Sequence, residues 1–169
     1  YRQALLLEPG RAQIHLNLAD AHRARGESAA ALRHYRRALK AEPNRVETHL
    51  KLGNALLGQN AVAEAIEHYR QALRLAPDLA LAHSNLGAAL AIQRQDAEAI
   101  DHYRRALQLK PDFAEAHNNL GRLLALRGQF AEAIDHYRRA LQIKPNYRQA
   151  RTNLAEALQA VGADPRSKP

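Results

Sequence analysis

Two sets of histidines recur at a fixed interval and have the side-chain chemistry to bind a metal ion. The first set is His15, His49, His83 and His117, the second is His34, His68, His102 and His136, and neighbours within a set are 34 residues apart. Zinc ligands lie about 2.0–2.1 Å from a common ion. If one interval corresponds to one pair of packed helices, neighbours in a set lie about 10 Å apart. Members of one set therefore cannot share an ion, and we expect no metal site and no cofactor.

These histidines must then have other roles. The first set occupies a position where a large packing residue is needed, so we expect it in the core or at a helix interface. We expect the second set to be exposed, beside a stripe of charged residues. His22 belongs to neither set and is expected at the edge of the core.

A further set with the same interval is composed mainly of asparagines: Asn17, Lys51, Asn85, Asn119 and Asn153. An Asn amide offers a donor and an acceptor, so it can pair with a peptide backbone through two hydrogen bonds. Packed helices lie about 8–10 Å apart, and an extended chain advances roughly 3.3 Å per residue. Asparagines on stacked helices would thus meet about every third residue of an extended ligand, with an interruption at Lys51. Alternatively, the same amides bond neighbouring helices and stabilise their stacking.

The elements that position these residues follow from the repeat itself. Residues 80–113 and 114–147 are identical at 23 of 34 positions. Each unit contains two segments with the apolar spacing of an amphipathic helix. Gly128 is expected to end the first helix of its unit in a left-handed conformation, and Pro145 to follow the end of the second. The residues after each proline are expected to cap the next helix: Asn44, Asp78, Asp112 and Asn146.

A glycine recurs inside the first helices at Gly53, Gly87 and Gly121. Glycine costs about 1 kcal/mol relative to alanine in a helix interior. The benefit that offsets this cost is expected to be close approach of the partner helix, because glycine has no Cβ.

This pattern resembles that of the tetratricopeptide repeat (TPR) family. The residues that carry it in one unit are His83, Leu86, Gly87, Leu90, Ala99, Tyr103, Ala106 and Pro111, with His at the position where the family usually has Trp. The resemblance implies an all-α TPR solenoid, a right-handed superhelix of antiparallel helix pairs whose first helices line a concave groove. It places one solenoid at residues 1–162: the end of a truncated repeat (1–11), repeats 12–45, 46–79, 80–113 and 114–147, and a terminal helix (148–162). A polar tail follows at 163–169.

The groove residues are similar to those in the TPR region of O-GlcNAc transferases and their bacterial relatives, where the groove holds substrate polypeptide. That resemblance, with the asparagine set, indicates a scaffold that binds an extended polypeptide or partner protein, as the selecting part of a larger protein. A glycosyltransferase domain is one candidate for the remainder. The expected contact residues are Asn17, Lys51, Asn54, Asn85, Asn119, Arg122 and Asn153. The alternative is a structural role in which the repeats self-assemble into a homo-oligomer.

Composition excludes several other classes. The chain of 169 residues has no Cys and no Trp, and its net charge is +8. No apolar run is long enough to span a bilayer, and no nucleophile, phosphate-binding or paired-carboxylate motif is present. We therefore expect a cytoplasmic, non-catalytic fragment. Arginines on the second helices, including Arg104 and Arg138, have acids three or four residues earlier and are expected to form a solvated surface rather than a nucleic-acid site.

Overall fold

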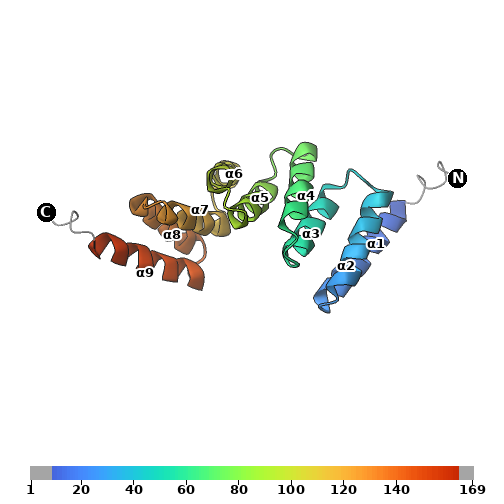
Figure 1. The fold of residues 1–169 in the computed structure, drawn as a ribbon, viewed down its shortest axis with the longest axis horizontal. Coiled ribbons are helices and arrows are strands. Elements are labelled where there is room, and N and C mark those ends of the chain that lie inside the picture. Colours follow the sequence, from blue (N-terminus) through green and yellow to red (C-terminus); the bar gives the residue numbers. More distant parts are fainter. Residues whose placement is uncertain (1–8, 164–169) are drawn as a thin grey trace. The chain divides into compact units, whose positions relative to one another are not determined.

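The computed structural model describes residues 9–163, and within this range all regular structure is α-helical (Figure 1). The elements are α1 (Pro9–Ala24), α2 (Ser28–Ala41), α3 (Val46–Leu57), α4 (Val62–Leu75), α5 (Ala80–Ile92), α6 (Asp96–Leu109), α7 (Ala114–Leu126), α8 (Phe130–Ile143) and α9 (Arg148–Ala163). The prediction of an all-α chain is confirmed. Most of the predicted remnant at 1–11 and of the predicted tail at 163–169 lies outside the described residues.

The chain divides into two compact units, residues 1–89 and 90–169, with the division inside α5. In the first unit, α2 packs against α1 and α3, and α3 packs against α4. In the second unit, α7 packs against α6, α8 and α9, and α8 also packs against α9. The first helices α1, α3 and α7 are thus each covered by the second helix of their own repeat, which is α2, α4 and α8 respectively.

The core of each helix pair is built on a buried tyrosine from the second helix. Tyr35, Tyr69, Tyr103 and Tyr137 are all among the largest fully buried or nearly buried side chains. A Cβ added to Gly53 would lie 2.6 Å from Tyr69 Cε1, and one added to Gly121 would lie 2.8 Å from Tyr137 Cε1. The expectation that these glycines permit close helix packing is therefore confirmed at Gly53 and Gly121.

The turn inside each repeat depends on one residue in the left-handed region. Gly128 has φ +76° and Gly26 has φ +75°, and the residues at the same place in the other repeats are Asn60 (φ 60°) and Arg94 (φ 61°). The prediction for Gly128 is confirmed. At Arg94 a bulky side chain occupies a conformation that costs about 1–2 kcal/mol for residues other than glycine.

The predicted capping role of the residues after each proline is wrong where the structure defines the cap. The residue before α3 is Arg45 and the residue before α7 is Phe113, and neither makes a side-chain capping hydrogen bond. The cause is a tight turn, since the backbone N–H of Arg45 bonds Glu42 O and that of Tyr147 bonds Lys144 O. Proline followed by Asn suits the centre of such a turn. The helix consequently begins one residue later than expected.

Candidate polypeptide-binding site

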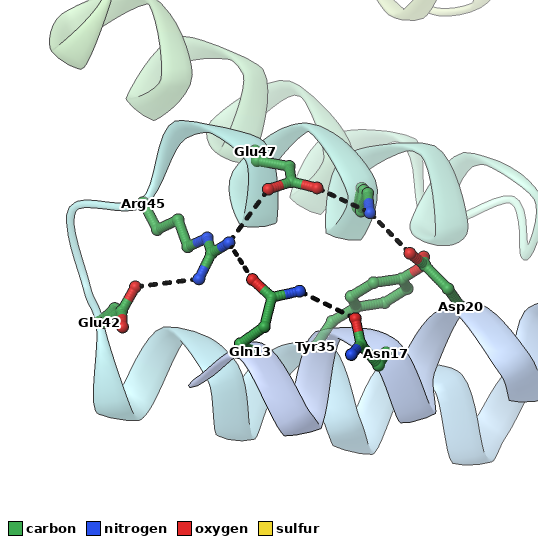
Figure 2. A network of polar contacts seen from close by, with 8 residues as sticks. Gln13, Asn17, Asp20, Tyr35, Glu42, Arg45 and Glu47 are labelled. Carbon is green, nitrogen blue, oxygen red and sulfur yellow. Dashed lines mark hydrogen bonds and ion pairs between the residues drawn. The ribbon is translucent and has the colours of Figure 1, made fainter. Parts of the chain in front are cut away.

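In the first unit, the polar residues of α1 and α3 bond one another across the two helices (Figure 2). The Lys51 ammonium donates to Asp20 Oδ2 at 2.6 Å and forms an ion pair with Glu47 at 2.8 Å. The hydroxyl of Tyr35 donates to the other Asp20 oxygen, also at 2.6 Å. Lys51 is therefore held by two carboxylates of its own chain.

The ionisation of this cluster follows from these bonds. Burial alone would raise the pKa of the Asp20 carboxyl, but the hydrogen bonds from Lys51 and Tyr35 hold it below its usual value. Burial alone would likewise lower the pKa of Lys51, whereas its bonds to Asp20 and Glu47 raise it. The cluster stays fully charged near neutral pH, with its charges largely compensated internally.

The asparagines of the first unit are also partly engaged. Asn17 Oδ1 accepts a 2.8 Å hydrogen bond from Gln13 on its own helix, and Asn17 is exposed. Asn54 Oδ1 accepts from the Tyr69 hydroxyl at 2.7 Å and from Asn85 Nδ2 at 3.1 Å. Asn85 thus links α5 to α3 in addition to any contact with a ligand. The bond to Asn54 leaves the rest of the hydrogen-bonding capacity of the Asn85 amide unused.

In the second unit, a chain of three amides joins α7 to α9. Asn153 Nδ2 donates to Asn118 Oδ1 at 2.9 Å, and Asn118 Nδ2 donates to Asn119 Oδ1 at 3.4 Å. Asn118 is fully buried. Asn118 is therefore a stacking residue, which explains an asparagine in this helix interior, while Asn119 and Asn153 are half-buried.

Each unit has one hollow lined by several of the predicted contact residues. The hollow in the first unit is about 320 Å³ and is lined by Arg23, Tyr35, Glu47, Leu50, Lys51, Asn54 and Leu81. The hollow in the second unit is about 270 Å³ and is lined by Arg122, Ala125, Leu126, Phe130, Tyr137, Asn153, Glu156 and Ala157. Of the predicted residues, Lys51, Asn54, Arg122 and Asn153 line a hollow, whereas Asn17, Asn85 and Asn119 line neither.

The two hollows differ in whether their charged groups already form ion pairs. Within the described residues, neither Arg122 nor Glu156 takes part in a hydrogen bond or ion pair, in contrast to Lys51. The floor beside them is apolar, and Leu126 is 61% exposed. Sequence reasoning did not select Phe130 or Glu156 as contact residues, although Glu156 shares the helix face of Asn153 and could have been found from it.

The two sets of histidines meet in pairs. His15 Nδ1 lies 3.0 Å from His34 Nδ1, His49 Nδ1 lies 3.1 Å from His68 Nδ1, and His117 Nδ1 lies 2.9 Å from His136 Nδ1. The prediction that the second set is exposed is wrong, because all four rings are half-buried, and three of them lie against a first-set partner. The described residues contain no group of three or more His, Asp or Glu side chains suited to a metal ion.

Comparison with known proteins identifies the fold. Sequence models described as tetratricopeptide repeat match residues 114–147, 1–46 and 16–80, and one described as TPR repeat matches 90–126. The crystal structure of MamA protein is 32% identical, with a TM-score of 0.80 over 90% of this chain and 83% of that one. The chain belongs to the tetratricopeptide repeat family. Its fold is an all-α TPR solenoid.

Two further solved structures share the fold at lower identity. YrrB, described as a TPR protein with an unusual peptide-binding site, is 22% identical, with a TM-score of 0.72 over 90% of this chain and 79% of that one. The Cut9–Hcn1 hetero-tetramer of APC/C is 24% identical, with a TM-score of 0.78 over 85% of this chain and 29% of that one. No curated protein matches the chain. TPR repeats are typically non-catalytic scaffolds for protein interactions. Within residues 9–163, every helix is too short or too polar to traverse a bilayer.

Proposed function

We propose that this TPR chain binds an extended polypeptide along its first helices, with the main contacts in the hollow of the second unit. The observation that carries the proposal is the pair Arg122 and Glu156, which line one hollow, are exposed, and are not ion-paired within the described residues. A peptide backbone offers carbonyl acceptors for Arg122 and N–H donors for Glu156. Asn153 lines the same hollow, and the remaining capacity of its amide adds a third polar contact.

The floor of this hollow favours a ligand with an apolar side chain. Leu126 and Phe130 lie beside the polar groups and offer apolar surface that a bound side chain would remove from water. Burial of apolar surface contributes about 25 cal/mol per Å². We infer that the preferred segment is extended, carries one apolar residue and bears no large net charge, since Arg122 and Glu156 have opposite signs.

In the first unit, ligand contact would rest on Asn54 and Leu81. Leu81 is 46% exposed and lines the same hollow as Asn54. Lys51 completes this proposed contact surface, but its ammonium is already bound by Asp20 and Glu47. The contacts proposed at Asn17, Asn85 and Asn119 use the amide capacity that their intramolecular hydrogen bonds leave. The neighbour YrrB, described as having a peptide-binding site, is consistent with a ligand of this class.

The test is selection of binders from a randomised library of 12-residue peptides, followed by calorimetry with the selected peptides. We expect Arg122→Ala to weaken binding at least tenfold. Arg139→Ala is the matched control, since Arg139 is an exposed arginine on α8 whose hydrogen bond within the described residues is to Gln142. Equal affinities for wild type, Arg122→Ala and Arg139→Ala would show that the peptides bind elsewhere.

Self-assembly is the second candidate, and one observation favours it. Ile14 and Leu18 on α1 are 58% and 40% exposed, whereas Leu52, Leu86 and Leu120, at the same repeat position as Leu18, are at most 1% exposed. This face of α1 is therefore suited to cover a helix of a second copy. Sedimentation across a concentration range tests the role: an oligomer that dissociates on Leu18→Ser supports it, and a monomer at all concentrations rejects it.

A further inference from the structure

Each described pair of histidines joins the first helix of a repeat to its second helix. The pairs are His15 with His34 (α1 and α2), His49 with His68 (α3 and α4), and His117 with His136 (α7 and α8), with Nδ1···Nδ1 distances of 2.9–3.1 Å. The ring planes are tilted by 38–42°, with centroids 5.1–5.3 Å apart. The same geometry thus recurs in three repeats, so it belongs to the repeat and not to one local environment.

The position of each proton follows from a third atom. His49 Nε2 lies 2.9 Å from Pro43 O, and His117 Nε2 lies 3.0 Å from Pro111 O. A carbonyl oxygen only accepts, so Nε2 of each first-set histidine carries the hydrogen. In the neutral ring Nδ1 is then the acceptor, and the Nδ1 of His68 or His136 must donate to it. The neutral pair therefore has one defined arrangement of hydrogens.

This arrangement accommodates one added proton but not two. A first proton at the Nε2 of His68 leaves the Nδ1–H···Nδ1 hydrogen bond intact. A second proton would have to go to the Nδ1 of His49, and two N–H groups would then face each other at about 3 Å with a positive charge on each ring. We propose that every such pair takes up at most one proton while its two helices stay packed, so that acidification below about pH 6 opens the helix pairs of this chain.

Some of the charged groups around the histidine pairs favour protonation of the rings, and others oppose it. Around His68 lie Glu64 and Glu67, which favour protonation, and Arg36, which opposes it. Around His136 lie Glu132 and Asp135 with Arg104, and Arg139 acts on His117. The groups that act on His34 are His15, His22, Arg37 and Arg33, all of which oppose its protonation, and Glu27 bonds His22, whose ring stacks on that of His34. The first repeat therefore opposes a second charge through its cations and is expected to open first.

Burial, like the geometry of the pairs, opposes protonation of these histidines. Burial, together with the charge of the partner ring, lowers the pKa of His68 and of His136 below the ordinary value of 6.5, and burial also lowers the pKa of His117. A lowered imidazole pKa means that the unfolded chain binds more protons than the folded chain below pH 6.5. Stability is unaffected above that pH and is lost as the pH falls, with the unfolding equilibrium constant rising about tenfold per pH unit for each pair.

The experiment compares denaturant unfolding of the wild-type chain and of the triple variant His34→Asn, His68→Asn, His136→Asn between pH 7.5 and 5. Asparagine places an amide near the position of Nδ1, and this amide can donate to a neutral partner ring or accept from a protonated one. We expect the ratio of the wild-type to the variant unfolding constant to rise about a thousandfold per pH unit below pH 6, if the three pairs open together. Equal pH slopes would overturn the proposal.

Imidazole ¹⁵N spectra at pH 7.5 provide a second readout that does not depend on stability. We expect the Nε2–H tautomer for His49 and His117 and the Nδ1–H tautomer for His68 and His136. Nε2–H tautomers at all four would overturn the proposal even if the slopes differ. If the triple variant does not fold at pH 7.5, the single variant His136→Asn replaces it, with an expected tenfold difference per pH unit; no difference would again overturn the proposal.

Discussion

The ring of Tyr69 lies so close to Gly53 that a Cβ on this glycine would be 2.6 Å from Cε1. The same tyrosine donates its hydroxyl hydrogen to Asn54, the next residue of α3. One side chain thus fixes both the distance between the two helices of the repeat and the orientation of an amide at the hollow of the first unit.

Replacing Gly53 by alanine is therefore expected to destabilise the fold, although alanine favours helix by about 1 kcal/mol. Overpacking a core costs roughly 1–3 kcal/mol, and Tyr69 is fully buried. We expect a net loss of about 1–2 kcal/mol in the free energy of unfolding, measured by urea denaturation. Gly58→Ala is the control: its added Cβ would lie 3.5 Å from the nearest atom, φ is −61°, and a gain of about 0.5 kcal/mol is expected. Similar losses for both variants would contradict the packing role of Gly53.

Replacing Arg94 by glycine is expected to stabilise the chain. Arg94 has φ 61°, a conformation that costs about 1–2 kcal/mol for an ordinary residue but little for glycine. After the greater backbone entropy of glycine in the unfolded state is subtracted, the gain is about 0.5–1 kcal/mol. The reciprocal substitution, Gly128→Ala, is expected to lose about 1 kcal/mol. Thermal unfolding of both variants tests the pair, and a loss on Arg94→Gly would refute it.

Replacing Asp20 by asparagine is expected to cost about 1 kcal/mol at pH 7.5, because the carboxylate accepts from both Tyr35 and Lys51. Its pKa is lowered from 3.8, so its stabilising effect is complete above that value and is lost only as the pH falls through the lower, folded-state pKa. The cost should therefore be the same at pH 5.5 as at pH 7.5. Asp101 is an exposed residue of α6, so Asp101→Asn is the control and should cost less than half as much.

Truncating Lys51 and truncating Arg122 are expected to affect a selected peptide differently. Lys51 is already bound by Asp20 and Glu47, so Lys51→Ala should weaken binding less than threefold while lowering stability by about 1 kcal/mol. Arg122 makes no ion pair within the described residues, so Arg122→Ala should weaken binding at least tenfold with little change in stability. Calorimetry and urea denaturation of both variants separate the two effects. The reverse order of affinities would indicate that the first unit holds the ligand.

The repeat and its helices were predictable because they depend on local information. The spacing of Pro43, Pro77 and Pro111 set the period, and the small residue at Gly53 indicated helix contact before the tyrosine that requires it was known. The helix starts were predicted wrongly because proline followed by Asn or Asp favours a turn as well as a cap. Only the hydrogen bond from the Arg45 N–H to Glu42 O distinguishes the two.

The pairing of the histidines was missed because each set was considered along the repeat and not across it. The separation of 19 residues between His15 and His34 recurs from His49 to His68 and from His117 to His136, and this constant offset was the available signal. The hydrogen bond from Asn153 to Asn118 could not be predicted in the same way. An amide on a helix looks the same in sequence whether it faces a ligand or the next helix.

Arg151 occupies the position of the first-set histidines in α9, and its Nη2 donates to Pro145 O at 2.9 Å, as His49 Nε2 does to Pro43 O. A guanidinium keeps its hydrogens throughout the accessible pH range, and a protonated imidazole retains its Nε2–H. Acidification that separates a helix pair therefore does not itself break the bond that holds α3, α7 or α9 to the loop before it. These three loop contacts depend less on pH than the contact between the two helices of a repeat.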